Sequence, residues 1–261
     1  MIATITRLPA RIWHESTTAQ RVCYTLAALS AASGIFHIGI QLIDGGPWTG
    51  PVSWRKPVTF GLSFAIVLAT VAWIIGHIRM PATLRRVLLT AFATASLAEV
   101  TGITIQAWRG VPSHFNDTDP VSALISHTIL APMGGILIAV VLVLTVAALR
   151  PQPDTSAPLR LAIRAGLLVL TLAMVTGAVM IATGAGLTTT AGHTAAYRSG
   201  GWLKPSHALT MHAVTVLPLI AYTTDAVTGD IRLTHRVTTI ATTAYVLATI
   251  TVIALNLTAA P

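Results

Sequence analysis

The sequence predicts an all-α, polytopic membrane protein, and three observations lead to that prediction. The chain of 261 residues is 54% hydrophobic and only 9% charged, whereas soluble domains carry about 25% charged residues. It holds seven apolar segments that each reach about 20 residues, the length that crosses a bilayer core as a helix. None of them shows the strict polar alternation of an outer-membrane strand. We therefore expect one transmembrane domain, residues 1–261, built as a bundle of about seven helices.

The expected helices follow one another with short connections. The apolar segments are 21–43, 57–78, 87–108, 121–149, 161–185, 205–226 and 237–258. The first is expected to be retained, because no small-residue cleavage site follows it at signal-peptide distance. The fourth is the longest and is expected to tilt or to begin before the membrane. Pro, Ser and Asp in the connections RMPATLRR and RPQPDTSAPLR favour turns.

Two similar tetrapeptides open two of the segments. WRKP at 54–57 opens the second segment, and WLKP at 202–205 opens the sixth. Residue preferences can explain this similarity, because Pro is favoured in the first turn of a helix and Trp and Lys are favoured at a membrane interface. The alternative hypothesis is a repeated helix pair, as in transporters.

The distribution of cations predicts the orientation, because the side richer in Lys and Arg is cytoplasmic. With a cytoplasmic N-terminus, the inner side carries 11 cations, which are Arg7, Arg11, Arg21, Arg79, Arg85, Arg86, Arg150, Arg160, Arg164, Arg232 and Arg236. The outer side then carries five, which are Arg55, Lys56, Arg109, Arg198 and Lys204. We expect a multi-pass protein of the plasma membrane with its N-terminus inside and its C-terminus outside.

Charge placement and cysteine content argue against nucleic-acid binding and against cysteine-based sites. The net charge of +8 does not predict nucleic-acid binding, because the cations stand singly or in pairs at the ends of apolar segments rather than on one basic, water-exposed face. Cys23 is the single cysteine, so an intrachain disulfide and a cysteine-based metal cluster are excluded.

Ionisable residues inside the segments predict a site near the outer side, because such groups are costly in a membrane. Six of the nine histidines fall in the outer half, namely His37, His114, His127, His193, His207 and His212. Glu99, His37, His127 and His212 come from four different segments, and helical rise places them about 9–14 Å below the outer surface. We expect His37, His127 and His212 as metal ligands, His207 as a further candidate, and Glu99 as a catalytic group.

Other polar residues surround that level. Gln106 lies seven residues from Glu99 and therefore on the same helical face. Gln106, Arg55, Lys56 and Arg109 are expected to bind a cofactor, with the cations holding its anionic part. Imidazole suits Zn, Cu, Fe and haem, and two histidines on facing helices can ligate a b-type haem. The competing interpretation is structural: membrane histidines often bond neighbouring helices, and interfacial Arg, Lys and Trp anchor the chain.

Several motifs carry resemblances. WRKP at 54–57, QAWRG at 106–110, PSHFN at 112–116 and SHALTMHA at 206–213 resemble an uncharacterised family of bacterial multi-pass membrane proteins, over about residues 50–220. The stretch from Thr176 to His193, with 209–213, is similar in style to one half of haem A synthase. That resemblance implies haem ligation by His212 or His207, although the family has eight helices in two equivalent halves.

The leading functional prediction is an outward-facing His/Glu site that binds haem b or a transition metal (Zn, Cu or Fe) for a redox role. One alternative is a zinc-dependent membrane lipid hydrolase, since Ser33 lies four residues before His37 and a metal-bound water would be its nucleophile. A proton-coupled transporter using Glu99 and a non-catalytic membrane subunit are the others. Whether the chain is an enzyme stays open. Expected partners are the lipid bilayer and a quinone, a lipid or another membrane subunit.

Overall fold

A computed structural model describes residues 10–199 and 201–258, and every regular element in that part of the chain is a helix. In chain order these are α2 (Thr18–Asp44), α3 (Arg55–Ile74), the 3₁₀ turn η1 (Ile75–His77), α4 (Ala82–Trp108), α5 (Pro120–Ala123), η2 (Leu124–Leu130), α6 (Ala131–Leu149), α7 (Ala157–Ala191), α8 (His193–Ser199), α9 (Lys204–Thr228) and α10 (Ile231–Thr258). The all-α prediction is confirmed, and each expected segment coincides with a long helix.

Within the described residues, six helical stretches are long and apolar enough to cross a membrane: α2, α3 with η1, α4, the rod from α5 through η2 to α6, α7, and α10. The sixth predicted helix, α9, is 25 residues long, about 37 Å, but does not belong to this group. Its lysine, histidines and threonines lower its hydropathy. It packs against α3, α7 and α10, so part of its polar surface is covered by protein. The chain is a multi-pass membrane protein with one polar helix inside its bundle.

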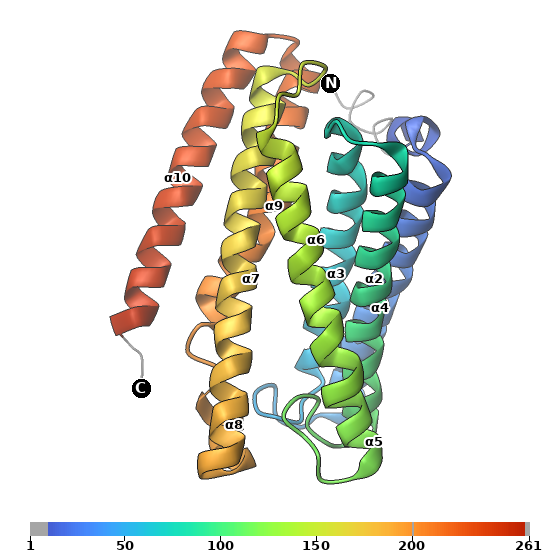
Figure 1. The fold of residues 1–261 in the computed structure, drawn as a ribbon, viewed down its shortest axis with the longest axis vertical. Coiled ribbons are helices and arrows are strands. Elements are labelled where there is room, and N and C mark those ends of the chain that lie inside the picture. Colours follow the sequence, from blue (N-terminus) through green and yellow to red (C-terminus); the bar gives the residue numbers. More distant parts are fainter. Residues whose placement is uncertain (1–9, 200, 259–261) are drawn as a thin grey trace.

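Six of the seven long helices in the described residues form two similar groups of three, and α6 contacts both groups through α4 and α7 (Figure 1). In the first, α3 packs closely on α2 and also contacts α4; in the second, α9 packs closely on α7 and also contacts α10. The helices that WRKP and WLKP introduce, α3 and α9, run parallel and touch. The Thr70 and Thr215 hydroxyls are 3.0 Å apart, and the Trp73 and Tyr222 rings pack edge to face. This arrangement agrees with the repeat hypothesis, which stays a hypothesis.

Glycine permits the closest helix approach in each group. A Cβ on Gly61 of α3 would lie 2.9 Å from the Cα of Gly34 in α2. A Cβ on Gly166 of α7 would lie 2.8 Å from the Cα of Val214 in α9. Backbones at this separation gain van der Waals contact, which is a main source of helix association in lipid.

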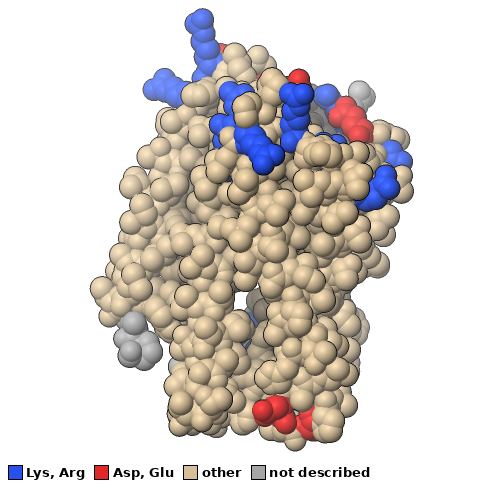
Figure 2. Space-filling model, in the orientation of Figure 1, with Lys and Arg blue, Asp and Glu red and all other residues tan. Residues whose placement is uncertain are grey.

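The two ends of the bundle differ in charge (Figure 2). We call the end where α2, α4, α7 and α10 begin the arginine-rich end, and the end where α3 and α9 begin the histidine end. Blue atoms gather at the arginine-rich end in Figure 2, above a broad uncharged belt. The positions at this end are those that the positive-inside count assigned to the cytoplasm, except that Arg7 lies outside the described residues.

Candidate functional site

His37 lies in an aromatic enclosure formed by α2, α3 and α4. Its side chain is buried, and its ring stacks on Trp54 with centroids 5.9 Å apart. Nδ1 donates to the carbonyl of Ser33 at 2.7 Å, and Nε2 accepts the indole N–H of Trp108 at 3.0 Å. Both ring nitrogens are therefore hydrogen-bonded, and the lone pair that a metal needs faces Trp108. As a metal ligand His37 stays a prediction, and it would require Trp108 to move.

Glu99 lies in α4, nine residues before Trp108 and hence about 13 Å deeper. It is 6% exposed, and no hydrogen bond or ion pair to it is found among the described residues. A Cβ placed on Gly134 of α6 would lie 3.8 Å from its Oε1, with no other heavy atom that close. Glu99 thus faces a part of α6 that has no side chain, which leaves its carboxyl group uncommitted.

The two histidines of α9 differ in their bonding. His207 Nδ1 donates to the carbonyl of Ala173 at 2.9 Å, and the hydroxyl of Thr176 is 3.3 Å from the same nitrogen. The His207 ring also packs on Gly177, where a Cβ would lie 3.1 Å from Cε1. His212 is half-buried and has no hydrogen-bond partner among the described residues. His207 Nε2 and both His212 nitrogens remain available to a ligand.

His127 lies on the outside of the rod from α5 to α6. It belongs to η2, a π-helical segment, and its side chain is exposed. Pro132 explains the widened turn, because it lacks the N–H that would bond to the carbonyl four residues earlier. Over residues 10–199 and 201–258 no group of three or more His, Cys, Asp or Glu side chains is arranged to hold a metal ion. The expected set of His37, His127, His212 and Glu99 is thus not gathered around one point.

Cations from α3 and α9 meet at the histidine end, and we call Arg55, Lys56 and Lys204 the outer cation cluster. Lys56 Nζ donates to Ser113 Oγ at 3.2 Å, and the charges of Lys204 and Arg55 both act on it. Arg55 Nε donates to the carbonyl of Trp48 at 3.1 Å. No carboxylate lies within ion-pairing distance of these three among the described residues. The cluster therefore carries uncompensated positive charge.

His114 adjoins this cluster. Its Nδ1 lies 3.0 Å from Ser113 Oγ, and this oxygen also accepts a hydrogen bond from Lys56 Nζ. Burial, and then the positive charge of Lys56, lower the pKa of His114 to about 4. His114 is therefore neutral at physiological pH, with one ring nitrogen as a donor and the other as an acceptor. Ser113 was not among the expected site residues, because sequence spacing does not reveal a contact between α3 and a distant loop.

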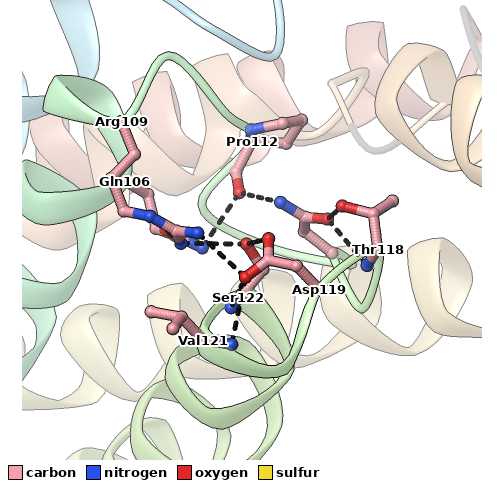
Figure 3. Close-up of polar contacts among 8 residues, drawn as sticks. Gln106, Arg109, Pro112, Thr118, Asp119, Val121 and Ser122 are labelled. Atoms are coloured by element: carbon pink, nitrogen blue, oxygen red, sulfur yellow. Dashed lines mark hydrogen bonds and ion pairs between the residues drawn. The ribbon is translucent and has the colours of Figure 1, made fainter.

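Arg109 and Gln106 have structural partners (Figure 3). Arg109 donates from Nη1 to Gln106 Oε1 at 2.5 Å and to Ser122 Oγ at 3.1 Å, and from Nη2 to Asp119 at 2.8 Å. Asp119 also caps α5 through the backbone N–H groups of Val121 and Ser122. Hydrogen bonds from Ser122 and the charge of Arg109 lower the pKa of Asp119 to about 2. This network joins the end of α4 to the start of α5, and the cofactor-binding role of Arg109 and Gln106 stays a prediction.

Phe115 joins the loop after α4 to the second helix group. Its φ of 55° is in the left-handed region, unusual for a bulky residue. Its carbonyl accepts from His193 Nδ1 at 2.7 Å and from the Tyr197 hydroxyl at 3.2 Å. Its ring lies where a Cβ on Gly184 would be, so only glycine leaves room for the ring there. No sequence signal marks Phe115 for this conformation, which is set by partners in α7 and α8.

The histidine end is hollowed between its two sides. Figure 2 shows a recess in the lower half of the surface, between the strip formed by α7 and α8 and the strip formed by α5, η2 and α6. Gly135 in α6 and Gly186 in α7 belong to the two sides, and a Cβ added at either position would meet no heavy atom within 4 Å. The arrangement offers cations near the surface and uncommitted imidazole and carboxyl groups deeper down.

Comparison with family models, with curated proteins and with solved structures finds no match for this chain. The resemblances to an uncharacterised bacterial membrane family and to haem A synthase therefore stay predictions.

Proposed function

We propose that this protein lies in the plasma membrane with the arginine-rich end in the cytoplasm, and that its histidine end binds an amphipathic anion, with haem b as the leading candidate. The positive-inside rule supports the orientation. A C-terminal alkaline phosphatase fusion is expected to be active and a C-terminal green fluorescent protein fusion dark. The opposite result would reverse the orientation and put the histidine end inside.

His207 carries the haem or metal part of the proposal. Histidines that bind metals usually donate their other ring N–H to a carbonyl or carboxylate, which fixes the ring and the tautomer. His207 has this arrangement, with Nδ1–H on the carbonyl of Ala173 and Nε2 left as the ligand atom. His212, which has no partner among the described residues, is the second candidate. A bound haem would supply one-electron chemistry.

The outer cation cluster supports an anionic ligand. Lys204 precedes His207 by three residues on α9, so the two side chains share one face of that helix. Lys56 is in the first turn of α3, Lys204 is in the first turn of α9, and these two helices contact each other. Cations near an imidazole fit the carboxylates of haem, or an anionic lipid headgroup, with Phe60 beside His114 for the apolar part.

An optical spectrum tests the haem. Protein purified from cells grown with ample iron is expected to show a Soret band that disappears in His207→Ala and is kept in His235→Ala, an exposed histidine at the arginine-rich end. Loss of the band in His212→Ala alone would move the ligand to His212. Folded protein without a Soret band, and without Zn, Cu or Fe by elemental analysis, would exclude the haem or metal role.

Glu99 favours proton-coupled transport as the second candidate function. An intramembrane carboxyl group without a hydrogen-bond partner is typical of proton relays. In proteoliposomes, Glu99→Gln is expected to abolish proton movement, whereas Glu15→Gln, an exposed residue paired with Arg11, is expected to retain it. Equal rates for Glu99→Gln and wild type would reject this candidate. The zinc-hydrolase and non-catalytic subunit hypotheses stay predictions, with no contact in the described residues that favours them.

A further inference from the structure

The arginine-rich end contains a cavity far from the site described above. It has a volume of about 190 Å³. One side is formed by η1 and the connection to α4, and the other side by the connection from α6 to α7. The side chains that decide its chemistry are His77, Arg79, Arg85, Gln152, Asp154 and Thr155. The space is large enough for several waters, or for a tetrahedral anion with its first waters.

Hydrogen bonds between the two connections hold the cavity walls. Gln152, which is buried, accepts the backbone N–H of Arg79 at 2.7 Å and donates to the carbonyl of Ala147 at 2.8 Å. The hydroxyl of Thr155 donates to the carbonyl of His77 at 2.8 Å. These bonds fix the wall geometry before any ligand arrives, so little ordering remains for the binding step.

The cavity is predominantly positive. Arg79 and Arg85 contribute two guanidinium groups to its wall. The single carboxylate on the wall, Asp154, is exposed and makes no ion pair within the described chain. The first turn of α4 also begins here without a side-chain cap, so its free N–H groups add partial positive charge.

Arg85 supplies the observation that points to a ligand. Its Nη2 donates to the carbonyl of Ile78 at 3.3 Å, but its Nε is buried and has no hydrogen-bond partner in the described residues. Such a buried N–H of a charged group lacks an acceptor, which is unfavourable. A guanidinium prefers an oxyanion that accepts two of its N–H groups, and an oxyanion held against Arg85 would supply the acceptor that Nε lacks.

We infer that this cavity binds a phosphate group, with Arg85 and Arg79 as its principal donors. Arginine forks match phosphate oxygens in geometry as well as in charge. The cavity lies where helices end, at the level of lipid headgroups, so the phosphate can belong to a lipid of the adjacent leaflet or to a soluble molecule.

Binding measurements with purified full-length protein test the inference. In a phosphate-free maltoside detergent, inorganic phosphate and short-chain phosphatidylglycerol are titrated separately, and affinity is read by thermal shift and native mass spectrometry. Arg85→Gln is expected to weaken binding at least about tenfold, because it removes a charged donor pair. Arg86→Gln is the matched control, since Arg86 is adjacent and exposed but does not line the cavity.

The outcomes separate the two sources of phosphate. Binding of the lipid alone assigns a headgroup site, and binding of inorganic phosphate alone assigns a soluble ligand. Asp154→Asn is expected to tighten binding, because it removes the only acidic group on the wall, and it keeps the test decisive if Arg85→Gln does not fold. Binding of neither probe, or equal affinities in Arg85→Gln and Arg86→Gln, would overturn the inference.

Discussion

The two ends of the bundle hold their connections in different ways. At the arginine-rich end, short connections are fixed by single side chains, Gln152 and Thr155, that bond to backbone groups of the neighbouring connection. At the histidine end, longer loops are fixed by rings that pack between helices: Trp54 and Trp108 around His37, and Phe115 against Gly184. A short connection has few conformations to exclude, whereas a long loop needs a buried side chain to hold it.

The two ends also differ in how their ionisable side chains are bonded. Many arginines of one end are exposed, and partly buried ones bond to nearby carbonyls, as Arg164 does to those of Ala148 and Arg150. The other end buries Glu99 and leaves His212 without a partner among the described residues. Buried groups that are not used for structure are the ones that can serve chemistry, and loops on a rigid scaffold commonly carry function.

The largest expected effect comes from filling the space occupied by the Phe115 ring. Gly184→Leu is expected to lower the free energy of unfolding by about 3 kcal/mol, because the leucine side chain would occupy the space of the Phe115 ring. The Phe115 ring cannot move aside without breaking the hydrogen bond between its carbonyl and His193. Thermal unfolding in detergent measures it. Gly186→Leu is the control in the same helix, with nothing within 4 Å of its Cβ, and is expected to be neutral or slightly stabilising. Equal effects in both would mean that Phe115 does not hold the loop.

A smaller loss is expected at the arginine-rich end. Gln152→Ala removes the acceptor of the Arg79 N–H and the donor to the Ala147 carbonyl, which costs about 2 kcal/mol. Thr155→Val removes one hydroxyl bond while keeping the shape, and about 1 kcal/mol is expected. Denaturation of both variants under one condition gives the comparison. A larger loss for Thr155→Val than for Gln152→Ala would contradict the role of the amide.

The length of the apolar segments predicted most of the helices. Every expected segment is a helix, because only a hydrogen-bonded backbone can cross a membrane. The segment at 205–226 shows where prediction from apolar length fails. Its length predicted a membrane span, but the helix is too polar to count among the candidate spans and is partly covered by α3, α7 and α10.

The site was predicted less completely. Depth along a helix is readable from sequence, so Glu99 and His212 were correctly expected to be polar groups within the helices. The direction in which a side chain points around the bundle cannot be read from sequence. The sequence therefore did not predict that His127 is exposed on η2 or that His37 is enclosed by Trp108. The pairing of Lys56 with Ser113 joins residues 57 positions apart, and no periodicity encodes it.

The third effect tests the enclosure of His37. Trp108→Phe keeps an aromatic ring but removes the N–H donor to His37 Nε2, and a loss of about 1 kcal/mol is expected. The double variant with His37→Ala is expected to lose less than the sum of the two single variants, because the residues share one bond. Additive losses would show that the bond does not form. Metal uptake that appears only in Trp108→Phe would instead support His37 as a latent ligand.

The smallest effect at neutral pH concerns His114, whose contribution to the stability of the fold changes as the pH falls. Burial and Lys56 lower its folded pKa to about 4, from an ordinary value of 6.5. The unfolded chain therefore binds the proton more readily, so the stability that neutral His114 contributes is complete above pH 6.5 and is lost as the pH falls toward 4. His114→Gln is expected to unfold with a flatter pH dependence than wild type across this window, measured by thermal denaturation at half-unit steps. His235→Gln, exposed at the other end, should retain the wild-type slope. If His114→Gln keeps that slope too, the histidine end does not depend on a neutral imidazole beside Lys56, and the contrast between the two ends would lie in packing alone.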